Sequence, residues 1–153
     1  MWKIPLFDLD YSDLEKKAVS RVLDSKWLSI GEKTKEFEHL FSHYLGSNNI
    51  KSTAVSSCTA ALHIAMIIGN IKPGDEVIVP GLTFVASANI VRIMGAKPIF
   101  VDVESFDNWN LSLTDLEKKI TQKTKAIVIV HFAGYPIETI DHIISLAKKK
   151  NIM

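Results

Sequence analysis

The sequence predicts an α/β protein with a mostly parallel sheet and flanking helices, preceded by two N-terminal helices. From residue 52 onward, strand-like segments alternate with helix-like segments, which is typical of a sheet built with right-handed crossovers. The segment 124–130 is almost continuously apolar, as a strand covered on both faces should be. With 153 residues, of which 47% are hydrophobic, the chain can form one domain with its own core.

Two amphipathic helices are predicted before residue 46. Ser12 and Glu15 have the spacing of a capping box at the start of the first helix. Its apolar face consists of Leu14, Ala18, Val19, Val22 and Leu23. The second helix has an apolar face of Thr34, Phe37, Leu40, Phe41, Tyr44 and Leu45 and stops at Gly46. Between the two helices we expect a loop over 26–33, with an exposed Trp27 and a flexible Gly31.

The remaining elements follow from the alternation. Strands are predicted at 52–57, 76–80, 97–103 and 124–130, and helices at 59–68, 84–94, 114–121 and 137–149. Gly69 and Gly95 should end two of the helices. Thr114 with Glu117 should cap the third helix, and Pro136 should lie in the first turn of the fourth.

Charge and composition argue against several partners. Eighteen basic and 17 acidic residues give a net charge of +1, so nothing in the overall balance favours nucleic acid or an anionic membrane. The longest apolar run, 60–68, is interrupted by His63 and is far shorter than the roughly 20 residues of a membrane span. The N-terminus lacks the apolar core of a signal peptide. The single cysteine, Cys58, suits a reducing compartment, so we expect a cytoplasmic protein, and we expect no metal site.

The junction at 56–61 is the first candidate site. Small and hydroxyl-bearing residues stand where a strand should lead into a helix, and the free N–H groups of such a helix attract phosphate. Ser57 or Thr59 could equally well act as a plain helix cap. No G-x-G-x-x-G or Walker pattern is present, which argues against the usual dinucleotide and nucleoside triphosphate loops.

A second candidate lies at the carboxyl end of the next predicted strand. Phe84 follows the turn Pro80-Gly81-Leu82-Thr83 and opens a predicted helix at the edge of the sheet where ligands gather. Its ring could stack on a flat ligand or simply pack in the core, and the sequence pattern leaves both open.

Four stretches in the same order resemble the DegT/DnrJ family of sugar aminotransferases, which use pyridoxal 5′-phosphate (PLP) and have the fold of the type I PLP-transferases. These stretches are KWLSIGEKTKEFEHLFSHYLG, VSSCTAALHIA, IKPGDEVIVPGLTFVASANIVRIMGAKPIFVDV and NLSLTDLEKKITQKTKAIVIVHFAGYP. The resemblance implies that the chain is the N-terminal part of the large domain of such an enzyme. Residues 1–153 would then form a single domain, with a helical segment at 1–51 and a cofactor-binding half at 52–153.

The resemblance also implies site residues. It assigns Cys58, Thr59 and Ala60 to the cofactor phosphate and Phe84 to stacking on the pyridine ring. Trp27, Ser29 and Gly31 would border the sugar-nucleotide site, near a dimer partner. Family members commonly have glycine at the position of Cys58, and a glycine needed for a positive φ angle would make a cysteine there strained.

Other residues in family-like motifs, Asp102 and His131, are interpreted as structural: a turn residue at a strand end and a histidine with a hydrogen-bond partner. The Schiff-base lysine and the aspartate that binds the pyridine nitrogen are expected beyond Met153, the aspartate on a strand that would begin at 152–153. We therefore expect no catalytic residue and no transaminase activity in residues 1–153 alone.

For the complete protein, the resemblance implies transfer of an amino group, from glutamate, to a nucleotide-linked keto sugar for surface polysaccharide or related amino-sugar synthesis. The expected partners are the nucleotide sugar, the amino donor and a second copy of the chain. Two alternatives remain: a non-catalytic association module of the same fold, and a PLP-dependent sugar dehydratase of the same family.

Overall fold

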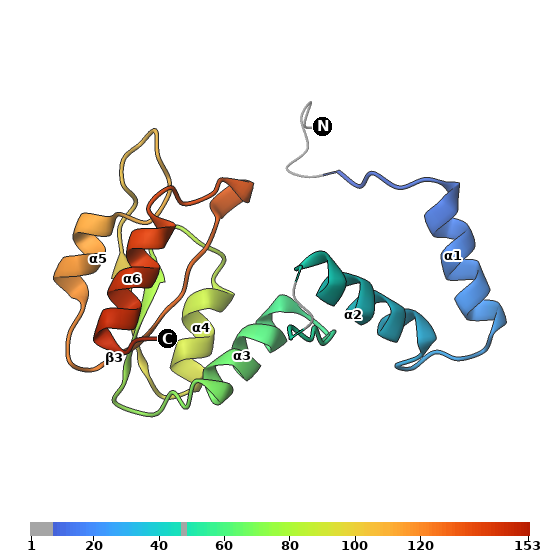
Figure 1. Cartoon of the computed structure of the whole chain (residues 1–153), viewed down its shortest axis with the longest axis horizontal. Helices are drawn as coiled ribbons and strands as arrows, with labels where there is room; N and C mark the ends of the chain where they lie inside the picture. The colour runs from blue at the N-terminus through green and yellow to red at the C-terminus, as the bar shows by residue number, and fades with distance from the viewer. Residues whose placement is uncertain (1–7, 47–48) are drawn as a thin grey trace. The chain divides into compact units, whose positions relative to one another are not determined.

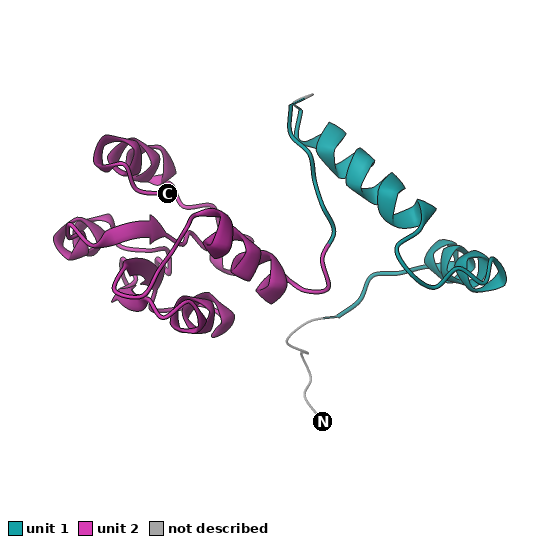
Figure 2. Ribbon diagram, turned by 90° about the horizontal axis from the view of Figure 1, so that it is seen from below, with its two compact units in different colours: residues 1–54 teal, residues 55–153 magenta. Residues whose placement is uncertain are grey.

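The computed structural model describes residues 8–46 and 49–153 of the chain. The chain divides into two compact units, unit 1 (Met1–Ala54) and unit 2 (Val55–Met153), coloured teal and magenta in Figure 2. The α/β class predicted from the sequence is confirmed, because unit 2 contains a parallel sheet with helices on both faces. That residues 1–153 form a single domain stays a prediction.

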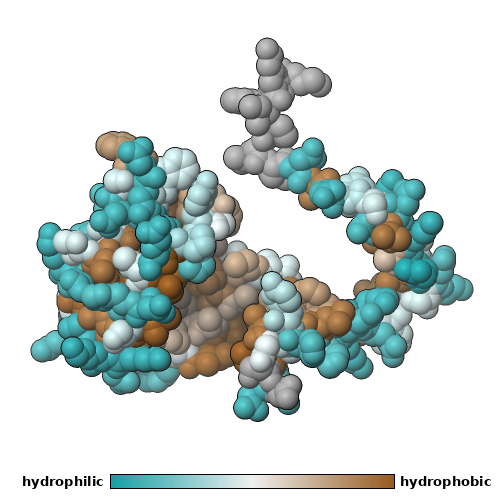
Figure 3. All heavy atoms as spheres, turned by 45° about the horizontal axis from the view of Figure 1, so that its top comes forward, coloured by the Kyte–Doolittle hydropathy of each residue, from teal (hydrophilic) through white to brown (hydrophobic). Residues whose placement is uncertain are grey.

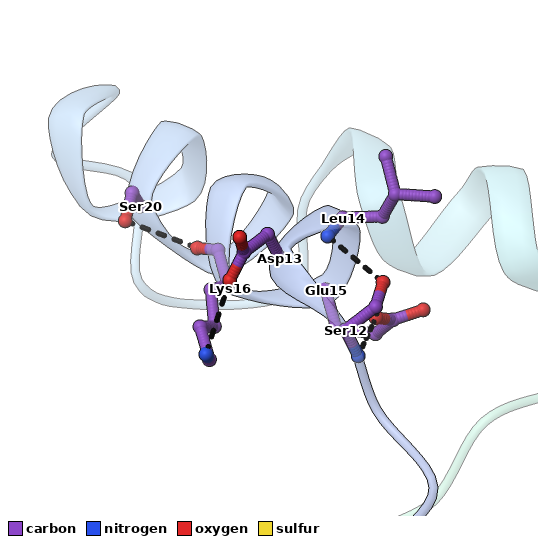
Figure 4. A network of polar contacts seen from close by, with 6 residues as sticks. All are labelled: Ser12, Asp13, Leu14, Glu15, Lys16 and Ser20. Atoms are coloured by element: carbon purple, nitrogen blue, oxygen red, sulfur yellow. Dashed lines mark hydrogen bonds and ion pairs between the residues drawn. The ribbon is translucent and has the colours of Figure 1, made fainter.

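The first helix of unit 1, α1 (Asp13–Asp24), begins with the predicted capping box, drawn in Figure 4. The Ser12 Oγ accepts a hydrogen bond from the Leu14 N–H at 3.1 Å. In return, the Glu15 carboxylate accepts bonds from the Ser12 N–H at 2.6 Å and from the Ser12 hydroxyl at 2.8 Å. These bonds, led by the one from the Ser12 backbone, lower the pKa of Glu15 because they favour its charged form.

The second helix, α2 (Glu32–Tyr44), starts two residues before the predicted apolar pattern, with Gly31 as its N-cap. Gly46 follows the C-terminal turn with φ +74°, the left-handed conformation for which glycine is favoured. No described residue of unit 1 is buried, so the apolar faces of α1 and α2 are open to solvent. Figure 3 shows brown, hydrophobic residues on the surface of these helices. The exposed apolar residues on these helices include Leu14, Val19, Leu23, Phe37, Leu40, Phe41 and Tyr44.

The predicted strand at 52–57 is wrong. In the described part of the chain this segment has no neighbouring strand, and its amides bind α2 instead. The Ser52 N–H donates to the Ser42 hydroxyl at 2.8 Å, and the Ala54 N–H donates to the Glu38 carboxylate at 2.8 Å. An extended segment becomes a strand only when a partner satisfies its backbone groups, and here side chains do so.

Unit 2 contains a three-stranded parallel sheet in the order β2-β1-β3, with β1 at Glu76–Pro80, β2 at Lys97–Val101 and β3 at Thr124–Ile127. The last two strands are shorter than predicted. Beyond β3, the Val128 N–H still donates to the Ile78 carbonyl at 2.8 Å. Met153 lies on the other side of β3: its N–H donates to the Lys125 carbonyl at 3.0 Å and its carbonyl accepts from the Ile127 N–H at 2.9 Å, the pattern of a parallel bridge.

The sheet separates two apolar cores because successive side chains of a strand point to opposite faces. Val77 and Val79 of β1 contribute to one core, on the side of α3 (Cys58–Ile68) and α4 (Ala86–Ile93). Ile78 contributes to the other, on the side of α5 (Leu113–Lys119) and α6 (Ile140–Lys150). All three β1 side chains are fully buried, and Figure 1 shows the helix pairs on the two sides of the sheet.

Two predicted helix starts need correction. The N-cap of α5 is Ser112, whose Oγ accepts from the Asp115 N–H at 3.4 Å, so the predicted Thr114–Glu117 capping box is wrong. Pro136 does not lie in the first turn of α6, which begins at Ile140. The carbonyl of Pro136 instead accepts a bond from the Asn110 side chain at 3.0 Å. None of the helices in the described ranges is both long and apolar enough to cross a bilayer.

Candidate cofactor and substrate sites

The first turn of α3 presents two backbone N–H groups without a protein acceptor. Ser57 caps the helix: its Oγ accepts from the Ala60 N–H at 3.1 Å, and its carbonyl accepts from the Ala61 N–H at 3.1 Å. Within the described residues, no acceptor binds the N–H of Cys58 or Thr59, and both residues are exposed. These two amides lie at the positive end of the helix dipole and can receive an anion.

The sequence left two interpretations of this junction open, a helix cap and an anion site, and this geometry is compatible with both. Ser57 does cap the helix, and the cap engages only the third of the three residues named for the phosphate, Ala60. Cys58 is the first helical residue and is not among the described residues with positive φ, so cysteine adopts this position without the backbone strain considered from the sequence.

Phe84 lies on the turn that follows the carboxyl end of β1, before α4. Its side chain is 74% exposed, so it is not part of either core. The turn is held by a hydrogen bond of 3.1 Å between the hydroxyls of Thr83 and the buried Ser87, and by the Ser87 N–H, which donates to the Phe84 carbonyl. An exposed aromatic ring on a hydrogen-bonded turn at the ligand edge of a parallel sheet is available for stacking.

The close packing before this turn requires glycine. A Cβ atom on Gly81 would lie 3.2 Å from the Val101 carbonyl oxygen, which already accepts the Gly81 N–H at 2.7 Å. A hydrogen bond therefore joins the carboxyl ends of β1 and β2 just before the segment that carries Phe84. Because the C-terminal end of α3 leads through residues 69–75 to the amino end of β1, the first turn of α3 points away from that amino end of the strand.

Trp27, Ser29 and Gly31 all line one cavity of about 690 Å³ within unit 1. The Trp27 indole N–H donates to the Ile30 carbonyl at 3.1 Å, and a Cβ on Gly31 would lie only 2.6 Å from the indole Cδ1. Glycine thus lets the indole approach the backbone of the loop closely. The structure brings these three predicted residues together, whereas the four predicted cofactor residues belong to unit 2.

The cavity also has basic residues that the sequence analysis did not single out. Arg21, Lys33 and Lys35 line it together with one acidic residue, Glu32. Lys33 forms an ion pair with Glu36, which lowers the pKa of that carboxyl chiefly through the hydrogen bond. Arg21 could have been found from its position in the last turn of α1, next to the loop that carries Trp27.

Asp102 and His131 have the structural roles expected of them. The Asp102 carboxylate accepts from the Val103 N–H at 2.8 Å, just after β2 ends. The His131 Nδ1 accepts from the N–H of the buried Ile137 at 3.1 Å. Asp115 was not among the predicted residues; its carboxylate accepts from the Asp102 N–H at 2.9 Å and from the Lys119 ammonium at 2.7 Å. The Lys119 bond, followed by the Asp102 bond, lowers the pKa of Asp115.

Comparison with known proteins places these features in a family. The chain is 42% identical over 151 residues to GDP-perosamine synthase of Escherichia coli O157:H7, covering 97% of this chain and 40% of that protein. It is 36% identical to UDP-4-amino-4-deoxy-L-arabinose–oxoglutarate aminotransferase of Shewanella sediminis, covering 97% of this chain and 37% of that protein. The chain thus spans about 40% of the length of the curated relatives it matches.

Solved structures agree with the sequence matches. The structure of GDP-4-keto-6-deoxy-D-mannose-3-dehydratase of E. coli with bound hydrated PLP is 31% identical and superposes with a TM-score of 0.85, covering 97% of this chain and 39% of that one. The sequence profile of the DegT/DnrJ/EryC1/StrS aminotransferase family matches residues 10–153, which include every candidate residue described above. The chain therefore belongs to the DegT/DnrJ/EryC1/StrS aminotransferase family.

Proposed function

We propose that this chain supplies the phosphate-binding and ring-stacking part of a PLP-dependent enzyme that transfers an amino group from glutamate to a nucleotide-linked keto sugar. The observation that carries this proposal is the pair of N–H groups of the exposed residues Cys58 and Thr59, which have no acceptor in the described protein. In the complete protein, residues 1–153 would form part of one large domain.

The first turn of α3 fits a phosphate ester. The two free amides and the helix dipole would bind its oxygens, and the exposed Thr59 hydroxyl would add a donor. Ala60 contributes mainly its small side chain, because its N–H already donates to Ser57. No lysine or arginine is needed for this contact, since backbone donors alone can hold a phosphate at a helix N-terminus.

Phe84 would hold the pyridine ring by stacking on one face, from the turn that the Thr83–Ser87 bond stabilises. PLP, when bound, supplies an electron sink that stabilises negative charge at the carbon undergoing proton transfer. The residues described in this chain orient that group; none of them is assigned to move the proton.

The cavity of unit 1 is proposed as the substrate-binding region. Trp27, Ser29 and Gly31 would contact the sugar nucleotide, and the basic rim of Arg21 and Lys35 suits its diphosphate. The two named relatives support a nucleotide-linked sugar as the substrate class, and the oxoglutarate aminotransferase supports glutamate as the amino donor.

Assembly and location complete the proposal. The exposed apolar faces of α1 and α2 support association with a second copy, because a helix with such a face is stable only when the face is covered. The exposed free Cys58 supports a reducing compartment, the cytoplasm. The same apolar faces would serve the alternative, a non-catalytic association module.

A sugar dehydratase is the second candidate, and the similarity to the E. coli dehydratase favours keeping it. One assay separates the two. The natural protein carrying residues 1–153 is incubated with PLP, ¹⁵N-glutamate and a nucleotide-linked 4-keto sugar, and products are followed by mass spectrometry. We expect ¹⁵N in the sugar nucleotide. Loss of a sugar hydroxyl without ¹⁵N would establish the dehydratase, and an unchanged substrate would support the association module.

A further inference from the structure

A second cavity lies in unit 2, between the loop after β2 and the loop after β3. It has a volume of about 580 Å³ and is lined mainly by Asp107, Trp109, Phe132, Tyr135, Pro136 and Glu138. Both loops leave the carboxyl end of the sheet, and Figure 1 shows them together at one end of the unit, in gold and dark orange. No candidate residue for the cofactor or the sugar nucleotide lines this cavity.

Contacts between the two loops, and one within the loop after β2, shape the walls. The Asn110 side-chain amide donates to the Pro136 carbonyl at 3.0 Å. The rings of Trp109 and Phe132 meet edge to face with their centroids 5.9 Å apart, and the Trp109 indole N–H donates to the Phe106 carbonyl at 2.8 Å. A hydrogen bond and a ring contact therefore join the two loops, and the cavity between them is an open hollow, with Trp109 54% and Tyr135 69% exposed.

The charged residues that line this cavity are all acidic. Asp107 and Glu138 contribute two carboxylates, and the lining includes no lysine, arginine or histidine. In the part of the chain that the structure describes, no ion pair or side-chain hydrogen bond engages either carboxylate. Both residues are exposed, so their carboxylates are free to pair with a cation, whereas an anionic ligand would be repelled here.

We propose that this cavity binds a small organic cation, a protonated amine on a compact carbon ring or chain. The ammonium group would pair with Asp107 and Glu138, and the carbon skeleton would lie against Trp109, Phe132 and Tyr135. Aromatic rings attract cations through their negative faces, and carboxylates add a direct charge interaction. Both features therefore select the same kind of ligand.

Three probes of the same shape test the charge preference: cyclohexylammonium, cyclohexanol and cyclohexanecarboxylate. Binding to the full chain is followed by two-dimensional NMR at the indole N–H of Trp109, identified by its loss in Trp109→Phe. We expect saturable shifts with cyclohexylammonium and affinity about fivefold weaker for cyclohexanol, the effect of two exposed charge contacts. We expect no binding of cyclohexanecarboxylate. Equal binding of all three probes, or no response at Trp109, would overturn the proposal.

Variants test the assigned residues. In the double variant Asp107→Asn/Glu138→Gln, affinity for cyclohexylammonium should fall about fivefold. The matched control is Glu104→Gln, which removes a negative charge from the same loop outside the cavity lining and should change affinity less than about twofold. If the control weakens binding as much as the double variant, the general charge of the loop accounts for the binding and the site is refuted. The amide spectra of all variants show whether the fold is kept.

Discussion

Replacing Cys58 by proline removes one backbone N–H from the first turn of α3 and leaves the helix otherwise intact. Cys58 is the first residue of α3, where proline is tolerated because its φ fits and the N–H is not needed for the helix. Ser57, which precedes it, is extended with ψ 161°, as proline requires of the residue before it. The Cys58 N–H has no acceptor in the described protein, so no internal hydrogen bond is lost.

The effect on phosphate binding follows from the number of donors. Only Cys58 and Thr59 have free amides in this turn, so Cys58→Pro removes one of two. A hydrogen bond to a charged group contributes about 1.5–3 kcal/mol. At the lower end, which suits an exposed site, the affinity for PLP should fall roughly tenfold. The matched control, Cys58→Ala, removes the thiol but keeps the N–H and should bind like the unmodified chain.

Equilibrium dialysis with PLP measures the dissociation constants of the three proteins, and thermal unfolding followed by circular dichroism checks that their stabilities agree. Equal affinities of Cys58→Pro and Cys58→Ala, with both proteins folded, would refute the assignment of this amide to the phosphate. A loss in both variants would instead assign the effect to the thiol.

Three further substitutions test the fold. Asp115→Asn should cost about 1 kcal/mol at pH 7 by breaking the contact with Lys119. Because the pKa of Asp115 is lowered in the folded chain, this cost should shrink as the pH falls below about 4 in denaturant titrations. Gly95→Ala should lower stability by about 1–2 kcal/mol, since φ is +73° there, and an unchanged melting temperature would contradict this. Ser12→Ala should reduce the helix content of α1, measured by circular dichroism, and equal helix content in the variant and the unmodified chain would argue against the cap. The helix content of the unmodified chain should also fall as acid protonates Glu15.

Much of the fold could be predicted because local patterns agree with tertiary packing. The capping box of Ser12 needs only its own helix, and β1 has the apolar run of a strand buried on both faces. The segment 52–57 has strand-like residues as well, but a strand also needs a neighbour, and in the described structure its amides bind Ser42 and Glu38. Sequence patterns do not report where such a partner lies.

The candidate site was predictable to a similar extent. Small residues at a strand-to-helix junction indicated the anion position, but only the structure shows that Ser57 engages Ala60 and leaves Cys58 and Thr59 free. Ser57 and Thr59 could each have capped the helix, and the choice depends on the backbone angles at the junction. The cavity around Trp27 likewise depends on how the indole lies on Gly31, which is a matter of tertiary geometry.

The most direct test of the phosphate site compares PLP with pyridoxal, which has the same ring and aldehyde but no phosphate. Amide resonances of the whole chain are followed by ¹H–¹⁵N NMR during both titrations. The account predicts that PLP shifts the Cys58 and Thr59 amides strongly and saturably, whereas pyridoxal leaves them nearly unchanged. Equal shifts with both compounds, or shifts confined to residues outside the first turn of α3, would contradict it.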